Sequence, residues 1–437
     1  MYNDRRESLA NLLSVCKFFG AVWDWEVYFI FTMNIFVLLI IAMAIIVMLL
    51  RKHVAVGPSM MVGALFLWAM RSLDINILGQ ALVEFLSMGR SYDLIAALAL
   101  VMCLEIELRT SGTLAGLVQA LQRLFSSAKV VLAVMPAFLG LLPSLGGARF
   151  SAPIVEEASK GTGLNEDQKA AINFWFRHPF EFSNPIIPGM IMACSIAQVA
   201  YADLVVHTAW MSLVCIAVGW IVLIRPIKLD YELKLDEENK DFRKNVLDIA
   251  LSLSPVLGTF CLVVLFKLNA SISMGIMTAL LFVVLRLLGR QVSLKEVVLG
   301  AFDKKMFINV ICILYFIQIL TDTKVLAETV EAFKAAPLPI PVSVALVSIV
   351  IGILTGMSQA HVSVIMPIVA AIDPGNLNLA AVAMIFGVAG QMLTPTHMCL
   401  IVTLDFFEAN IFKTLKPILL IECIVLSIFS AVMYVVW

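Results

Sequence analysis

The stretch Gly140-Leu-Leu-Pro-Ser-Leu-Gly-Gly-Ala-Arg-Phe-Ser151 has a counterpart 212 residues later, Gly352-Ile-Leu-Thr-Gly-Met-Ser-Gln-Ala-His-Val-Ser363. When the two stretches are aligned without gaps, one glycine, one leucine, one alanine and one serine are identical, and Arg149 aligns with His361. Both stretches interrupt long apolar segments with glycine and polar residues. The pattern predicts two broken apolar helices at matching places in the chain.

A second pair of interruptions follows about thirty residues after the first pair. One is Arg-His-Pro-Phe-Glu-Phe-Ser-Asn-Pro (177–185), and the other is Gln-Met-Leu-Thr-Pro-Thr-His (391–397). Paired interruptions of apolar segments in two halves of a chain are typical of the binding site of a secondary transporter.

The composition indicates a protein that lies in a membrane. Of 437 residues, 61% are apolar and 14% charged, and mean hydropathy is +0.99. A soluble protein of this length could not cover so much apolar surface. The net charge of −1 gives no reason to expect a nucleic-acid partner. The eight cysteines form no Cys-x-x-Cys pair, so we interpret them as small core residues, not as disulfides or metal ligands.

Hydropathy divides the chain into two halves of similar layout. We expect an interfacial segment at 1–26, a first repeat at 27–224, a charged cytoplasmic linker at 225–245 and a second repeat at 246–437. In the first repeat, scaffold helices at 27–127 precede a hairpin and a broken helix at 128–202 and a helix at 204–224. In the second, the corresponding ranges are 246–336, 337–410 and 414–437. The predicted fold is an all-α integral membrane protein.

The distribution of basic residues predicts that the two repeats have opposite topology. If Arg51 and Lys52 are cytoplasmic and each hairpin enters and leaves on one side, 20 of the 30 Lys and Arg residues lie inside. Only Arg149 and Arg177 then lie at membrane depth. The segment 27–50 runs inward and 246–266 runs outward, so each repeat contains a re-entrant hairpin and a broken transmembrane helix in inverted orientation.

The first pair of interruptions predicts a seat for an anion. Gly146 and Gly147 leave backbone N–H groups uncovered where a new helix begins, and Arg149 adds guanidinium donors. Gln359 and His361 hold the corresponding places in the second hairpin, and we expect all five to contact substrate. The alternative is a glycine-rich packing contact between helices.

The second pair of interruptions predicts a site for a cation or for polar substrate groups. Proline frees a carbonyl one turn back, and carbonyls combined with hydroxyl and amide oxygens suit Na⁺. The pairs expected are Ser144 with Asn184, and Ser358 with Thr394 or Thr396. Proline kinks satisfied by their neighbours are the alternative.

Four ionisable residues accompany these interruptions. Arg177 and Glu181 could pair at i,i+4 spacing; otherwise Arg177 faces substrate and Glu181 carries a proton or cation. His178 and His397 are further candidate substrate contacts that could titrate near neutral pH. The alternative for each histidine is an ordinary hydrogen-bonded role inside the bundle.

Three motifs resemble the ion-transporter superfamily, which includes carriers for citrate, dicarboxylates, gluconate and arsenite. They are Leu-Pro-Ser-Leu-Gly-Gly-Ala (142–148), Asn-Phe-Trp-Phe-Arg-His (173–178) and Thr-Pro-Thr-His-Met-Cys-Leu (394–400), and they look like a prokaryotic branch classed as a domain of unknown function. The resemblance implies a homodimer whose hairpins and broken helices move as an elevator. The hairpin tips match the Ser-Asn-Thr triplets of sodium-coupled members only in part, which leaves Na⁺ and H⁺ coupling open.

We therefore expect a secondary transporter in a prokaryotic cytoplasmic membrane that carries a small organic anion, with a carboxylate as the favoured group. A carrier of a zwitterionic or neutral solute, with Glu181 as counter-charge to Arg177, is the second hypothesis, and an ion channel is the third. The sequence has no Walker A, His-Glu-x-x-His or Gly-x-Ser-x-Gly motif, so we expect neither an ATPase nor a hydrolase. No cofactor is expected other than Na⁺ as a coupling ion.

Overall fold

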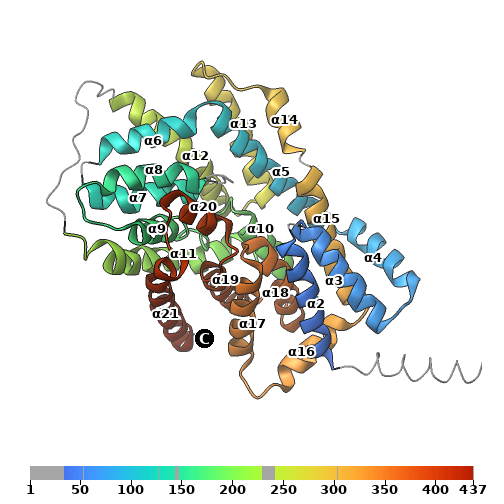
Figure 1. Cartoon of the computed structure of the whole chain (residues 1–437). Coiled ribbons are helices and arrows are strands. Elements are labelled where there is room, and N and C mark those ends of the chain that lie inside the picture. The colour runs from blue at the N-terminus through green and yellow to red at the C-terminus, as the bar shows by residue number, and fades with distance from the viewer. Residues whose placement is uncertain are drawn as a thin grey trace, which may run out of the picture. The chain divides into compact units, whose positions relative to one another are not determined.

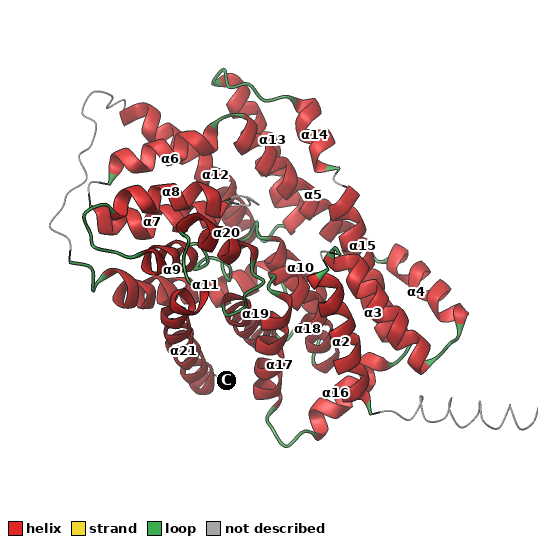
Figure 2. Cartoon of the chain, viewed as in Figure 1, coloured by secondary structure: helices red, strands yellow, loops and turns green. Residues whose placement is uncertain are grey.

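The computed structural model describes residues 34–52, 54–125, 127–142, 147–228, 242–302 and 304–436. Every regular element in these ranges is a helix (Figure 2). The expected interfacial segment 1–26 and most of the expected linker 225–245 lie outside the described residues.

The chain divides into two compact units. Unit 1 contains described residues 34–87 and 311–335, and unit 2 contains those of 88–310 and 336–436. The helices of unit 1 are α2 (Ile35–Arg51), α3 (Val56–Arg71), α4 (Ile75–Ser87), most of α15 (Lys304–Asp322) and α16 (Val325–Ala335).

Unit 1 is held together by side chains from both ends of its discontinuous sequence. Helix α2 packs against α3 and α16. Arg71 of α3 forms a 2.7 Å ion pair with Glu328 of α16, and the Tyr315 hydroxyl donates to the Leu78 carbonyl at 2.7 Å. Segments from the two halves of the sequence thus build one unit.

Unit 2 contains a comparable group of five helices, which are α5 (Gly89–Thr110), α6 (Thr113–Leu124), α12 (Phe242–Phe266), α13 (Ala270–Leu287) and α14 (Leu294–Ala301). Helix α5 packs on α13 and α14, and α12 packs on α6 and α13. Buried Asp248 of α12 pairs with Arg290, which also donates to the Thr113 hydroxyl at 3.3 Å. The Asp248 carboxylate fits because Gly116 of α6 has no side chain to displace it.

The rest of unit 2 consists of two sets of five helices in the same order (Figure 1). The first set is α7 (Ala128–Leu141), α8 (Gly147–Ser159), α9 (Glu166–Phe176), α10 (Pro188–Ala197) and α11 (Tyr201–Gly219), which continues as the π-helical turn η1 (Trp220–Ile224). The second set is α17 (Ile340–Thr355), α18 (Ser358–Ile372), α19 (Leu377–Met392), α20 (Met398–Phe407) and α21 (Ile411–Val436).

The contacts within the first set have counterparts in the second. Helix α7 packs on α8 and α9, as α17 packs on α18 and α19, and α11 packs on α19 as α21 packs on α9. Helices α10 and α20 each have 10 residues and end at a left-handed residue, Gln198 (φ 61°) and Glu408 (φ 51°). The helix breaks predicted within 177–185, 352–363 and 391–397 are confirmed, and in the first hairpin α7 ends at Leu141 and α8 begins at Gly147, with 143–146 outside the described residues.

Within the described residues, four continuous helices are long and apolar enough to cross a bilayer: Tyr201–Ile224, Arg243–Phe266, Ala270–Leu287 and Ile411–Val436. Two of them match the helices expected at 204–224 and 414–437, and the other two lie largely in the range 246–336 expected for scaffold helices. Apolar residues such as Leu213, Leu265 and Phe412 are exposed on them, between 70% and 81% of their surface. Exposed apolar faces of this extent fit a multi-pass membrane protein.

Candidate functional site

The tip of the second hairpin rests on the second helix break. Helix α17 ends at Thr355, Gly356 adopts a left-handed conformation (φ 66°), and α18 begins at Ser358. A Cβ atom on Gly356 would lie 2.6 Å from Oγ1 of Thr396. The Thr394 and Thr396 hydroxyls are hydrogen-bonded to each other at 2.9 Å. Only glycine combines this backbone angle with so close an approach.

The first hairpin is attached to the first helix break by side chains. The amide of Asn184 donates to the Leu141 carbonyl at the end of α7 (2.6 Å), and its oxygen accepts from the backbone N–H of Ile186 (3.1 Å). Arg177 donates to the Leu139 carbonyl at 3.5 Å. Asn184 and Arg177 therefore satisfy carbonyls that the end of α7 leaves open.

Part of the predicted anion seat lies outside the described residues. These are Gly146 in the hairpin tip and the side chain of Arg149 in α8, and Ser144 of the predicted cation site lies outside the described residues as well. The backbone of Gly147 is described, and α8 begins there, one residue before the expected start near Ala148. The pairing of Ser144 with Asn184 stays a prediction.

Glycines let the hairpins approach the broken helices closely. Gly140 of α7 lies against the backbone carbonyl of Arg177, and its counterpart Gly352 of α17 lies against the carbonyl of Gly387. At both places a Cβ atom would collide with that oxygen. The glycines that aligned in the sequence therefore hold equivalent packing positions.

Each set also contacts the other. Helix α10 packs on α18, and α20 packs on α8. A Cβ atom on Gly189 of α10 would lie 2.8 Å from Cβ of Ser358, so Ser358 faces the first broken helix. Buried Asn173 of α9 donates to the Thr403 hydroxyl of α20 at 3.0 Å. The two hairpins and the two broken helices thus meet in one region of unit 2.

Two further candidate residues of the second hairpin, His361 and Gln359, differ in burial. His361 of α18 is fully buried, and its ring occupies the space beside Gly387 that a side chain there would need. The ring therefore fills the α18–α19 packing contact. Gln359 is half-buried in the first turn of α18, closer to the tip.

The structure brings His178 and His397 together with Cys399. The ring centroids of the two histidines are 4.9 Å apart, and Phe174 of α9 contacts them edge-on at 4.9 and 5.3 Å. One donor atom from each of the two histidines and from Cys399 lies within 4.8 Å of the others. We define these three residues as the histidine–cysteine cluster. Sequence analysis missed Cys399, which it treated as a core residue, although His397-Met-Cys399 places two metal-ligating residue types two positions apart.

Backbone carbonyls fix both imidazole rings of the histidine–cysteine cluster. Nδ1 of His178 is 2.7 Å from the Phe174 carbonyl, and Nδ1 of His397 is 3.2 Å from the Gln391 carbonyl. A carbonyl only accepts, so in the neutral imidazole each Nδ1 carries the proton and each Nε2 holds the lone pair.

Glu181 interacts electrostatically with the same cluster. The histidines, Cys399 and Arg177 are the charged or ionisable groups around its carboxyl. Its Oε2 atom is buried and has no hydrogen-bond partner among the described residues. A buried carboxylate oxygen without a donor is costly, so this group calls for a proton or a cation.

One family model matches almost the whole length of the chain. The model of the family described as "Protein of unknown function (DUF401)" matches residues 34–437. The chain belongs to the DUF401 family. No curated protein matches it.

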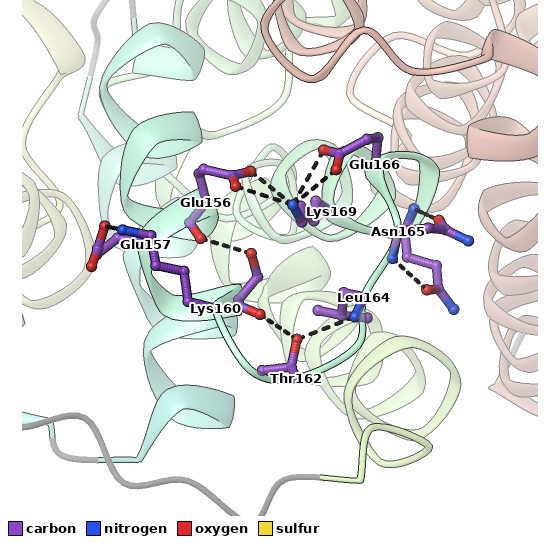
Figure 3. Close-up of polar contacts among 10 residues, drawn as sticks. Glu156, Glu157, Lys160, Thr162, Leu164, Asn165, Glu166 and Lys169 are labelled. Atoms are coloured by element: carbon purple, nitrogen blue, oxygen red, sulfur yellow. Dashed lines mark hydrogen bonds and ion pairs between the residues drawn. The ribbon is translucent and has the colours of Figure 1, made fainter.

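In this DUF401 protein the connection between the first hairpin and the first broken helix is highly charged. Lys169 of α9, whose side chain is 10% exposed, forms ion pairs with Glu156 of α8 (3.0 Å) and Glu166 (3.1 Å), as Figure 3 shows. Asn165 caps α9 through reciprocal hydrogen bonds with Gln168. The turn between α8 and α9 therefore holds a cluster of ion pairs whose carboxylates are 40% and 53% exposed.

The second connection of the DUF401 protein is simpler. Asn376 caps α19 by accepting from the Leu379 N–H at 2.9 Å and donates to Asp373 at 2.9 Å. No ion pair involves α18 or the start of α19 within the described residues. The two sets therefore share a layout but differ in charge.

Proposed function

We propose that this DUF401 protein is a secondary active transporter of a small organic anion, with a carboxylate group, in a prokaryotic cytoplasmic membrane. The observation that carries the proposal is the meeting of two broken hairpins and two broken helices in one region of unit 2, through Gly189–Ser358 and α20–α8. Irregular backbone survives at membrane depth only where protein or a water-filled cavity surrounds it. Paired interruptions of this kind form the substrate site of many carriers.

The substrate would bind where α8 and α18 begin. Backbone N–H groups at the start of a helix favour an anion, and Arg149 in the first turn of α8 would supply charge-assisted donors. Gln359 would contribute an amide from the opposite tip. A bound carboxylate would thus have hydrogen-bond partners in both hairpins.

Coupling to Na⁺ or H⁺ would use the helix breaks. Thr394, Thr396 and Asn184 offer hydroxyl and amide oxygens beside backbone freed by proline. Glu181 and the two histidines offer titratable groups. Experiment can distinguish Na⁺ coupling from H⁺ coupling, because only Na⁺ coupling requires an inward Na⁺ gradient for the substrate to accumulate.

The matched order and contacts of the two sets support an inverted repeat. We infer that each repeat runs through ten elements, with the first from α2 to α11 and the second from α12 to α21. Scaffold helices would hold a homodimer while the hairpins and broken helices carry substrate across by an elevator movement. Because α10 packs on α18 and α20 packs on α8, the two sets would move together as one body.

Transport by purified protein in proteoliposomes tests the proposal. A panel of radiolabelled mono-, di- and tricarboxylates would be offered under Na⁺ and pH gradients separately, with empty liposomes as the background. At least one anion should accumulate by saturable, gradient-dependent uptake. Lack of saturation would indicate a channel, and uptake of only neutral or zwitterionic solutes would overturn the anion assignment.

Substitution Arg149→Ala tests the anion seat itself. We expect uptake to fall to background while the yield and elution profile of the protein stay normal, because a guanidinium pair with a carboxylate is lost. Arg109→Ala is the matched control, since Arg109 at the end of α5 is 58% exposed and forms an ion pair with Glu105 of its own helix. Equal uptake by the wild type and Arg149→Ala would contradict the assigned role.

A further inference from the structure

The histidine–cysteine cluster has a donor set that the proposed anion seat at the starts of α8 and α18 does not use. It combines two imidazole nitrogens and one thiol sulfur, from the first helix break (His178) and from the cap and first turn of α20 (His397 and Cys399). Phe174, which is fully buried, covers the two rings. The site is thus shielded from solvent on the side of α9.

The orientation of the rings is the arrangement that metal-binding histidines require. Such histidines almost always donate the N–H that does not bind the metal to a carbonyl or a carboxylate, which fixes the tautomer. Here Phe174 and Gln391 supply these carbonyls at 2.7 and 3.2 Å. Both Nε2 lone pairs therefore remain available for a ligand, without any rearrangement of the backbone.

We propose that His178, His397 and Cys399 bind a divalent transition-metal ion of the zinc type. Imidazole and thiolate select Zn²⁺ and its neighbours over Na⁺, Mg²⁺ or Ca²⁺, which prefer oxygen. The thiolate of Cys399 offsets one charge of a divalent ion, and Glu181 is a further acidic group that interacts electrostatically with the cluster.

The distances leave room for such an ion. Tetrahedral zinc with bonds of about 2.0–2.3 Å places its ligand atoms roughly 3.5 Å apart. The three donor atoms lie within 4.8 Å of one another, so binding draws them together by about 1 Å. Side-chain rotation can supply this movement. Arg177 is the positive group nearby, and its hydrogen bond to the Leu139 carbonyl directs the guanidinium toward α7.

The ion would connect the two helix breaks. His178 follows α9 and Cys399 lies in the first turn of α20, so one metal ion would hold both sets of helices in this arrangement. This inference does not depend on anion transport, because none of the three donors belongs to the proposed anion seat.

Metal binding by the full-length protein tests the proposal. Protein purified in detergent and freed of metal would be titrated with Zn²⁺ against a chromophoric chelator, and with Co²⁺ followed by visible absorption. We expect one Zn²⁺ per chain and a thiolate-to-cobalt charge-transfer band. Substitutions Cys399→Ser and His397→Gln should each weaken Zn²⁺ binding at least about tenfold, and Cys399→Ser should remove the band.

Two matched control variants show whether Zn²⁺ binds outside the histidine–cysteine cluster. Cys423→Ser changes an exposed thiol of α21, and His207→Gln changes a histidine of α11 outside the cluster. Both should keep the wild-type affinity and spectrum. Elution profiles and metal-free melting temperatures would show whether each variant is folded. Folded Cys399→Ser with undiminished Zn²⁺ affinity, or a cobalt spectrum without thiolate character, would overturn the site. Neither result depends on whether the protein transports anions.

Discussion

The two helix breaks share a backbone layout but differ in chemistry. The first, between α9 and α10, contains Arg177, His178, Glu181 and Asn184 and is attached to α7 by side-chain hydrogen bonds. The second, between α19 and α20, is shorter, and the hairpin rests directly on it through Gly356. One half thus uses polar side chains where the other uses close backbone packing. The first break is suited to charge, and the second to a precise fit.

The packing glycines should give the largest effect, because both halves depend on them. We expect Gly140→Ala and Gly352→Ala each to lower the free energy of unfolding by about 3 kcal/mol or more, since the new Cβ meets a backbone carbonyl that cannot rotate away. Thermal melting of the detergent-solubilised protein and the yield of monodisperse material would measure the loss.

Gly79→Ala is the control for the glycine substitutions. Gly79 lies within α4, and a Cβ atom there has no neighbour within 4 Å. This variant should gain roughly 0.5–1 kcal/mol, because alanine loses less backbone freedom than glycine on folding. Gly140→Ala and Gly352→Ala variants with the stability of Gly79→Ala would show that the two sets do not pack as described.

One polar substitution in each helix break should lower stability by an intermediate amount, with a larger loss at the first break than at the second. Asn184→Ala removes two hydrogen bonds at a buried position and leaves the Leu141 carbonyl without its amide donor, which should cost about 1–3 kcal/mol. Thr396→Val removes a hydroxyl from a half-buried position and should cost about 1 kcal/mol or less. Urea unfolding followed by tryptophan fluorescence would compare them. Equal costs would mean that the second break also depends on its side chains.

The helix breaks were predictable because glycine and proline act locally on the backbone. Gly140, Gly352, Pro185 and Pro395 marked them in the sequence, and the helices end close to these residues. This signal depends on residues a few positions apart.

The histidine–cysteine cluster was not predictable in the same way. His178 and His397 were singled out separately, but their contact depends on how α9 packs against α20, far apart in the sequence. Cys399 lies in an apolar context that is typical of core cysteines. His361 aligned with Arg149, although its ring fills a packing contact against Gly387. Alignment of the halves locates equivalent backbone, while the environment of each side chain follows from tertiary packing.

The charged connection between α8 and α9 should give the smallest effect. Lys169 is nearly buried, but its partners Glu156 and Glu166 are 40% and 53% exposed, so water can replace the lost ammonium group. We therefore expect Lys169→Met to cost about 1 kcal/mol, measured by thermal melting, and to reduce the dependence of stability on salt. Lys160→Met in the same turn is the control, since that side chain is 61% exposed and its ion-pair partner Glu157 is exposed as well (Figure 3). It should leave the melting temperature unchanged. A Lys169→Met variant as stable as Lys160→Met would show that the first set does not need its charges at this turn, and that the two connections differ in composition but not in strength.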